Sequence, residues 1–327
     1  NQSLQQQVQK YQQLPKARIG MVKNAYAAGN TQLTKMADKV NQLSGTFQIL
    51  PDFLGSGQPR TYALMAMTTS EERSSGGLIG SVGVVTTDNG KISIGDFRSN
   101  GEYIPYGAGD PTEDEQRIFR QWGPLNMSFD VRDLAVYPDT SRSAEGMRAI
   151  WQRTPWGSNT QLDGVLMVDP VFLQELTKIS GNVTIPDGTV LTGDNTAEFL
   201  LNKVYVDYPV SMQDALFAQV AEQTVGSMFS NVDLAKLTKV AQLMGSMAEG
   251  RHFSMYAFDE TAEKTISDAG FTAQTPSSEE HPQVGVYVTE QNPSKMGWYI
   301  HRTSKVTRST CGNDGSQTYH VEYKMTN

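Results

Sequence analysis

The sequence contains a single cysteine, Cys311, among its 327 residues. A zinc site built from several cysteine thiolates is therefore excluded within this chain. So few cysteines are more typical of an oxidising or thiol-poor compartment than of the cytosol. Cys311 fits two interpretations equally well: a disulfide with a cysteine outside this chain, or a free thiol in a strand-rich region.

Long hydrophobic runs are also missing. No stretch approaches the roughly 18 consecutive apolar residues that a membrane-spanning helix needs, and no signal peptide is visible. The chain begins at Asn1 without a methionine, and we interpret it as a piece of a longer protein. The lack of an anchor in this piece therefore says nothing about the whole protein.

Basic residues are in the minority, with 27 Lys and Arg against 35 Asp and Glu and a formal net charge of −8. This balance disfavours a general nucleic-acid-binding protein, because affinity for the phosphate backbone requires a basic face. A local basic cluster would still suit a small anion. Hydrophobic content of 38% and charged content of 19% are typical of a globular protein with one large domain or two smaller ones.

Familiar catalytic motifs are absent as well. The sequence has no P-loop, no G-x-S-x-G elbow and no G-x-G-x-x-G after a strand. We expect Asp163-Gly164 and Asp169-Pro170 to shape turns and helix caps rather than to carry chemistry. The histidines show no metal-ligand spacing, so surface or strand-packing roles are expected for all of them. They are His252, His281, His301 and His320.

The hydrophobic pattern divides the chain into three parts. Residues 1–45 have a narrow apolar stripe at helical spacing, which predicts an N-terminal helical stalk or hairpin. Residues 46–250 alternate strand-length and helix-length patterns, as in an α/β core domain. Residues 251–327 form a strand-rich C-terminal portion that we expect to be truncated.

Within the core, residues 61–67 and 78–87 have the length and composition of strands. Asn89-Gly90 between Asp88 and Lys91 predicts a tight hairpin turn, because Asn-Gly readily adopts positive φ angles. A third strand is expected from Ile92 onward.

Further along, we expect a helix over residues 143–153 capped by Ser143 and a buried strand over 162–168. A helix should follow with Pro170 at its first position and Gly181 at its end. A long helical stretch is expected over residues 212–247. In the C-terminal portion, antiparallel strands are predicted at 284–288 and 298–306.

An ordered series of motifs resembles the bacterial family catalogued as domain of unknown function 4012, from about residue 45 to the C-terminus. These motifs are Arg60-Thr-Tyr-Ala-Leu-Met-Ala-Met, Glu72-Arg73-Ser-Ser-Gly76-Gly77, Asp88-Asn89-Gly90-Lys91, Arg132-Asp133, Pro138-Asp139, Leu162-Asp163-Gly164-Val165, Gly181-Asn-Val and Ser294-Lys295-Met296. The resemblance implies a membrane-anchored protein with most of its chain outside the cell. It implies no established activity.

Residues 162–183, a strand, a helix and then Gly-Val, also bear a fainter similarity to the LytR-CpsA-Psr family of envelope glycopolymer transferases. That similarity implies an α/β fold with a layered α-β-α sheet of the LytR-CpsA-Psr type. It also implies clustered arginines, an acidic residue and a divalent metal that hold a polyprenyl pyrophosphate. The stretch Asn202-Lys203-Val204-Tyr205 departs from this pattern, because Lys203 stands where an arginine pair is expected.

The best candidate site is the turn that carries Arg73 and Gly76-Gly77. Glycines let backbone amides approach a ligand closely, and Arg98 and Arg132 would converge on the same end of the sheet to form an anion-binding pocket. The alternative is structural: the glycines permit a bulge or a tight crossing, and Arg73 pairs with Glu71 or Glu72. We favour the structural reading of the turn.

Asp133 and Asp139 are the candidates for catalytic carboxylates. A Mg²⁺ ion usually needs one or two carboxylates plus phosphate oxygens, so Asp133 is the candidate metal ligand. The alternative, which turn statistics favour, makes Asp133 an ion-pair partner of Arg132 and Asp139 a turn or cap residue.

Two functional hypotheses follow. In the first, favoured narrowly, the protein is a non-catalytic extracytoplasmic envelope protein that binds a cell-wall or surface glycopolymer or a protein partner, with scattered arginines and an exposed apolar or aromatic patch. In the second, it is a Mg²⁺-dependent transferase acting on a polyprenyl-phosphate-linked glycopolymer, with an apolar groove for the lipid and the three arginines at its mouth.

Overall fold

The computed structural model describes residues 45, 48–121, 125–228, 234–278, 283–292 and 294–327. The helical segment predicted over residues 1–45 thus lies almost wholly outside the described residues. The strands are β1 (Arg60–Arg73), β2 (Gly76–Asp88), β3 (Lys91–Ile94), β4 (Arg98–Ser99), β5 (Gly164–Val168), β6 (Val183–Thr184), β7 (Val190–Leu191), β8 (Phe253–Ala257), β9 (His301–Cys311) and β10 (Gln317–Thr326).

The helices alternate with these strands through most of the chain. They are α3 (Asn100–Tyr103), α4 (Glu113–Gln116), α5 (Thr140–Trp151), α6 (Pro170–Ser180), α7 (Thr196–Glu198), α8 (Val204–Asp207), α9 (Val210–Met228), α10 (Leu234–Glu249) and α11 (Glu260–Asp268). Short 3-10 or π turns are η1 (Ile104–Tyr106), η2 (Arg117–Gln121), η3 (Val131–Val136), η4 (Phe199–Lys203) and η5 (Lys295–Tyr299).

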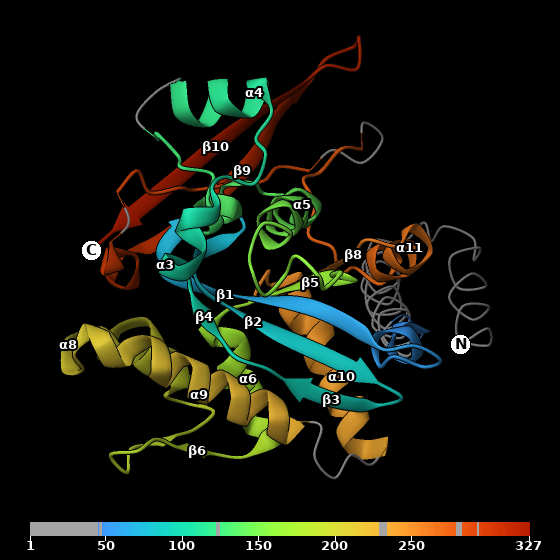
Figure 1. Cartoon of the computed structure of the whole chain (residues 1–327). Coiled ribbons are helices and arrows are strands. Elements are labelled where there is room, and N and C mark those ends of the chain that lie inside the picture. Colours follow the sequence, from blue (N-terminus) through green and yellow to red (C-terminus); the bar gives the residue numbers. More distant parts are fainter. Residues whose placement is uncertain (1–44, 46–47, 122–124, 229–233, 279–282, 293) are drawn as a thin grey trace, which may run out of the picture.

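The central sheet has the strand order β3-β2-β1-β5-β8, with β4 added beside β2. β1 and β5 are parallel, whereas β1–β2, β2–β3 and β5–β8 are antiparallel, so the sheet is mixed. Helix α5 lies on one side of the sheet and α6, α9 and α10 lie on the other (Figure 1). The predicted α/β class is confirmed.

Alternation along the strands fills both faces of this sheet, because successive side chains of a strand point to opposite sides. Ala63, Met65 and Met67 of β1 belong to the apolar cluster on the α5 side. Tyr62 and Leu64 belong to the cluster on the side of α6, α9 and α10. All five residues of β5 are buried, as expected for a strand covered on both faces.

Several local predictions are confirmed by the structure. Asp88 pairs with Lys91 across a turn in which Asn89 and Gly90 have φ angles of 47° and 85°, as a type I′ hairpin requires. Helix α6 begins with Pro170 and is followed by Gly181 at φ 98°.

Two local predictions are wrong. Ser143 does not cap α5, because the helix begins one turn earlier with Asp139 in the capping position, and the Ser143 hydroxyl donates instead to the carbonyl of Leu134 at 2.8 Å. Residues 284–288 are not a strand; the described backbone there is irregular, and the C-terminal hairpin is β9–β10. An apolar run predicts a strand only where a partner backbone is available to it.

The β1–β2 hairpin extends far beyond the rest of the sheet. Ala66 lies opposite Val168, the last residue of β5, so residues 67–73 of β1 overhang that end of the sheet. Two irregularities in the β1–β2 register, at Ala66/Met67 and at Thr68/Glu72, interrupt the regular pairing of this overhang. β-Bulges of this kind bend a strand and raise its twist.

Gly77 sits at the second of these irregularities. A Cβ atom at this position would lie 2.2 Å from the carbonyl oxygen of Thr68, a distance no real contact tolerates. Gly80, three residues further along β2, has more room, because its Cβ would lie 3.4 Å from the Thr68 hydroxyl. The glycine at 77 is therefore required by a close backbone approach within the overhang.

We therefore expect Gly77→Ala to lower the free energy of unfolding by roughly 3 kcal/mol, because the strands of the overhang must separate to admit the methyl group. Gly80→Ala, the matched control, should change it by less than about 1 kcal/mol. Urea unfolding followed by circular dichroism measures both. Equal unfolding midpoints for the two variants would show that the approach at Gly77 is not tight.

Candidate anion-binding cleft

A cleft lies at the end of the sheet where the two parallel strands finish. Arg73 ends β1, Asp169 directly follows β5, and Arg251 and His252 directly precede β8, so topology brings all four to this end. They line one open cleft of about 370 Å³ together with Glu72 and with Arg302 of β9. In open α/β sheets, ligands bind outside the carboxyl ends of the parallel strands.

Asp169 and His252 form a hydrogen-bonded pair at the floor of this cleft. Asp169 is 2% exposed, and its Oδ2 lies 2.6 Å from Nδ1 of His252. Its other oxygen, Oδ1, accepts from the backbone N–H of Phe172 and so caps helix α6. The hydrogen bond to Asp169 raises the pKa of His252 above its ordinary value of 6.5, against the opposing effect of burial.

Arg251 precedes this histidine with an unusual backbone. Its φ angle is 60°, in the left-handed region, although it is not glycine. A side chain in this conformation costs roughly 1–2 kcal/mol relative to ordinary backbone. Its Nη2 donates to the carbonyls of Pro138 and Gln274, and its guanidinium lies 5.3 Å from the ring centroid of Tyr287.

Strand β9 closes the cleft from the C-terminal hairpin. Arg302 forms an ion pair with Glu72 of the overhang, a carboxylate whose side chain is 5% exposed. Tyr323 of β10 lines the same cleft, directly opposite Ser304 in the hairpin register. Lys295 of η5, which precedes β9 in the chain, pairs with Glu71 of β1.

The cleft is lined by more basic than acidic side chains. Its lining contains three arginines, Arg73, Arg251 and Arg302, against two carboxylates, Glu72 and Asp169. Asp133 lies outside this lining but pairs with Arg73. With that carboxylate counted, the net charge is zero with neutral His252 and +1 when that histidine is protonated.

The sequence-predicted residue Arg73 is held by a buried ion pair. Its side chain is 1% exposed, and Nε and Nη2 both donate to Oδ1 of Asp133, at 3.0 and 2.8 Å. Nη1 donates to the carbonyls of Glu72 and Glu290. The guanidinium thus joins three segments that are distant in the sequence.

Asp133 is fully engaged on its second oxygen as well. Oδ2 accepts from the backbone N–H and the hydroxyl of Ser128, at 2.9 and 2.7 Å. Burial tends to raise the pKa of Asp133, but the Ser128 hydrogen bonds and the Arg73 charge outweigh it and hold that pKa below its usual 3.8. Asp133 forms an ion pair, as the alternative interpretation predicted, but its partner is Arg73 rather than Arg132.

The predicted diglycine has a structural role in the hairpin, and Gly76 also lines the cleft. Gly76 pairs with Arg73 across the two-residue turn Ser74-Ser75, and its φ of 141° is one that glycine adopts easily. The Ser75 hydroxyl donates to the carbonyls of Ala135 and Tyr137. Gly77 accommodates the close approach to Thr68 described above.

The structure brings together two of the three predicted arginines. Arg132 lines a second, smaller pocket of about 270 Å³ with Arg73 and Asp133. Its guanidinium forms a bidentate pair with Asp130, through Nε–Oδ1 at 2.9 Å and Nη2–Oδ2 at 2.6 Å.

Arg98 is engaged elsewhere. It donates to Glu102 at 2.9 Å and lies 4.3 Å from the ring centroid of Trp156, and it lines neither pocket that Arg73 lines. Anion binding by Arg73, Arg98 and Arg132 as one cluster remains a prediction that this arrangement does not favour.

Asp139 holds a segment of chain rather than a ligand. Its two oxygens accept from the backbone N–H and the hydroxyl of Thr275, at 2.5 and 3.3 Å. Across the described ranges, no three His, Cys, Asp or Glu side chains gather as a metal site. Asp133, the candidate Mg²⁺ ligand, has both oxygens occupied by protein donors, so a metal there would have to displace them.

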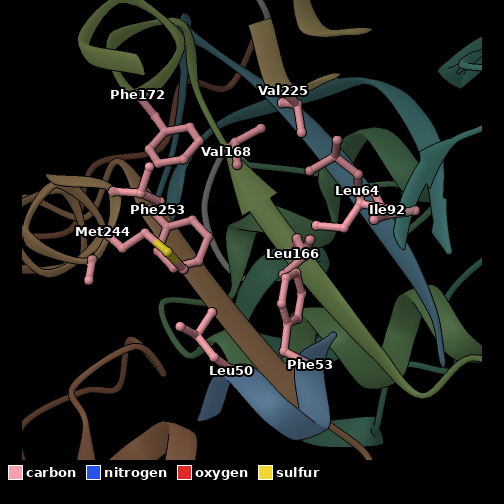
Figure 2. A pocket seen from close by; sticks show the side chains of 13 residues that line it. Leu50, Phe53, Leu64, Ile92, Leu166, Val168, Phe172, Val225, Met244 and Phe253 are labelled. Carbon is pink, nitrogen blue, oxygen red and sulfur yellow. The ribbon is translucent and has the colours of Figure 1, made fainter. Parts of the chain in front are cut away.

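An apolar cavity lies on the opposite side of the sheet from α5, between the strands and helices α9 and α10. Figure 2 shows Leu64, Leu166 and Val168 of the sheet pointing into it, with Phe53 and Met244 closing it. Its volume is about 60 Å³ and its lining is entirely apolar. No helix in the described part of the chain is both long enough and apolar enough to cross a bilayer.

The sequence reasoning singled out Arg73 and Gly76 of the cleft lining but gave no site role to its other charged residues. His252 was given a surface or strand-packing role, Asp169 a turn or capping role, and Arg251 and Arg302 were not singled out. One available signal was position: Asp169 follows a buried strand that was correctly predicted, and such positions gather at the ligand-binding end of a sheet. No sequence pattern places His252 beside it, because the two are 83 residues apart.

We expect Asp133→Asn to lower the free energy of unfolding by roughly 3–5 kcal/mol, because it leaves Arg73 charged, buried and without its carboxylate. Asp114→Asn, which removes the exposed pair with Arg117, should cost at most about 1 kcal/mol. Thermal unfolding at pH 7 measures both.

The same ion pair predicts acid sensitivity. The folded pKa of Asp133 lies below its unfolded value, so its contribution to stability is present above pH 3.8 and is lost as the pH falls further, through the folded pKa. Asp133→Asn should therefore show a shallower loss of stability below pH 4 than the wild type. Parallel acid-unfolding curves would contradict this assignment.

Comparison with known proteins gives a family but no activity. No curated protein matches the chain. Two solved structures share low similarity: the transcriptional regulator yvhJ from Bacillus subtilis, at 12% identity over 81% of this chain and 90% of that one with a TM-score of 0.29, and the Lin1025 protein from Listeria innocua, at 9% identity over 80% and 91% with a TM-score of 0.32. Neither likeness is close enough to carry an argument about fold or function.

The family comparison agrees with the motifs found in the sequence. The matched region spans β1 to η4 and includes the overhanging hairpin, the Arg73–Asp133 pair and Asp169. Arg251, His252 and Arg302 lie beyond it. Residues 57–205 match the family described as "Protein of unknown function (DUF4012)", the family whose motifs the sequence resembles.

Proposed function

We propose that this protein is a non-catalytic extracytoplasmic component of the cell envelope that binds an anionic envelope polymer. The polymer would lie along one surface, formed by the cleft and by the adjoining face of the β9–β10 hairpin. The single observation that carries this proposal is the junction of the two: Arg302 and Tyr323 belong to the hairpin and also line the cleft.

The hairpin has the composition of a polyanion-binding surface. Every residue of β9 and β10 is exposed. Residues 301–326 contain four basic side chains against two acidic ones, a net charge of +2. Arginine and lysine attract a charged polymer over a distance, and aromatic rings add stacking contacts with its flat or apolar parts.

One face of the hairpin is apolar and is exposed in the described part of the chain. Val306 pairs with Val321 in the register, and neighbouring positions on the same face place Tyr319, Tyr323 and Met325 beside them. These five side chains are between 38% and 51% exposed. Because an isolated two-stranded hairpin is marginally stable in water, such a face is better explained by a bound partner than by folding alone.

A second function, transfer of a polyprenyl-linked glycopolymer by a LytR-CpsA-Psr-like, Mg²⁺-dependent mechanism, has one observation in its favour. Figure 2 shows an apolar cavity between the sheet and helices α9 and α10, where a lipid tail would be sheltered from water. Its size argues against this function, because about 60 Å³ is well below the roughly 150 Å³ of a cavity known to admit benzene. A polyprenyl chain would require α9 and α10 to move away from the sheet.

Binding of purified poly(glycerol phosphate), measured by biolayer interferometry, tests the proposed function. We expect affinity to fall steeply with salt, because each cation that contacts a phosphate releases a counterion. Arg308→Gln on the apolar face of the hairpin should reduce the slope of log K against log salt by about one. Lys264→Gln on α11 is the matched control and should leave the slope unchanged. Failure of the wild type to bind at low salt would refute the proposal, as would equal binding of uncharged dextran.

The transferase hypothesis has its own test. We expect the purified protein to carry no isoprenoid phosphate in native mass spectrometry, and we expect farnesyl phosphate with Mg²⁺ to leave its melting temperature unchanged. A Mg²⁺-dependent rise of several degrees, which corresponds to binding well above the dissociation constant, would instead favour the transferase.

A further inference from the structure

We propose that Arg251 and His252 form a binding site for a tetrahedral dianion, the phosphate or sulfate ester group of a ligand, and that a proton on His252 controls its occupancy. This inference rests on the proposed function, because it names the chemical group that the cleft would hold. It concerns residues beyond the matched region and adds to the structural contacts that Arg251 makes with the carbonyls of Pro138 and Gln274.

Arg251 is the first part of the site. Within the described chain no carboxylate pairs with it, whereas Arg73 and Arg302 in the same cleft have Asp133 and Glu72 as partners. Its left-handed φ of 60° is a conformation in which glycine would be less strained. That conformation is the one expected just after the end of α10, where the N–H groups of Arg251 and His252 donate back to helix carbonyls, so it forms a helix cap and is not itself evidence of a binding role.

His252 is the second part, and Asp169 fixes its chemistry. Because Asp169 occupies Nδ1, a neutral imidazole keeps its proton there and leaves an unprotonated Nε2, which repels an oxyanion. The protonated ring has an N–H at Nε2 instead, which donates to an oxyanion. Within the described residues Nε2 has no hydrogen-bond partner in the protein. One proton therefore converts this atom from an acceptor to a donor.

The other charged groups around His252 are neutralised by ion pairs, so the protonation of His252 decides the net charge of the site. Glu72 and Arg73 of β1, Arg302 of β9 and Tyr323 of β10 line the cleft with it. Arg302 neutralises Glu72, and Asp133 neutralises Arg73. The charges that remain are those of Arg251, Asp169 and His252. They sum to zero when the histidine is neutral and to +1 when it is protonated.

Titration calorimetry with sulfate on the folded chain tests the site. Sulfate keeps its charge between pH 5.5 and 8, so any pH dependence arises in the protein. We expect wild-type affinity to rise about tenfold from pH 8 to pH 5.5, the gain typical of one charged hydrogen bond. His252→Asn keeps a donor for Asp169 but has no titrating proton, so it should lose this pH dependence. Arg251→Asn, which suits the left-handed backbone, should weaken binding about tenfold at both pH values.

Matched controls lie outside the cleft. Arg98→Asn and His320→Asn remove an arginine and a histidine from other surfaces and should leave sulfate affinity and its pH dependence as in the wild type. The proposal is overturned if His252→Asn keeps the wild-type pH dependence, or if Arg251→Asn binds as tightly as Arg98→Asn. A melting temperature for each variant shows that it is folded.

If His252→Asn does not fold, an NMR titration of the wild-type His252 ring replaces it. Bound sulfate should raise the pKa of this imidazole, and an unchanged pKa would overturn the proposal. Failure here is distinct from failure of the proposed function. Poly(glycerol phosphate) binding without sulfate binding overturns this site alone, whereas sulfate binding without polymer binding overturns the proposed function and leaves the site.

Discussion

The buried guanidinium of Arg73 is the constraint on which the rest of this end of the molecule depends. Beyond the end of β5, no strand among the described residues pairs with the overhanging β1–β2 hairpin. Arg73 ties it to Asp133 in η3 and to the backbone of Glu290 in the C-terminal part of the chain. A buried ion pair of this kind contributes little net stability, but it is costly to break because the remaining charge has no partner. It therefore fixes the position of the overhang more than it strengthens the fold.

The cleft is lined by the end of the overhang, by residues next to the ends of β5 and β8, and by the β9–β10 hairpin. Its two walls come from distant parts of the sequence, the overhang itself and the β9–β10 hairpin, and Glu72 and Arg302 join them. At the floor, Asp169 both caps α6 and holds His252, so the orientation of the imidazole is linked to the start of a helix. A floor held by hydrogen bonds and walls with polar side chains suit the recognition of a charged group.

The sequence was informative where structure is decided locally. Asn89-Gly90 specifies its own turn, because positive φ angles are a property of the two residues. Pro170 and Gly181 likewise mark the two ends of α6. The strand over 284–288 was predicted from a local alternating pattern, and it fails because strand formation depends on a partner that the pattern does not specify.

The candidate site was only partly accessible to the same reasoning. Arg73 and Asp133 were singled out correctly as important, but as possible ligand-binding groups, whereas the structure pairs them with each other. Asp169 and His252 are 83 residues apart and belong to no shared motif, so no pattern in the sequence predicts that they pair.

By itself the sequence determined the α/β class, the tight turn, the ends of α6 and the net acidity of the chain, because each of these follows from the intrinsic preferences of neighbouring residues or from composition. Only the tertiary structure decided which cations are neutralised by carboxylates and which, like Arg251, are not. The reason is physical: the interaction of two charges depends on their distance and burial, and folding alone brings β1, β5, β8 and β9 to one place.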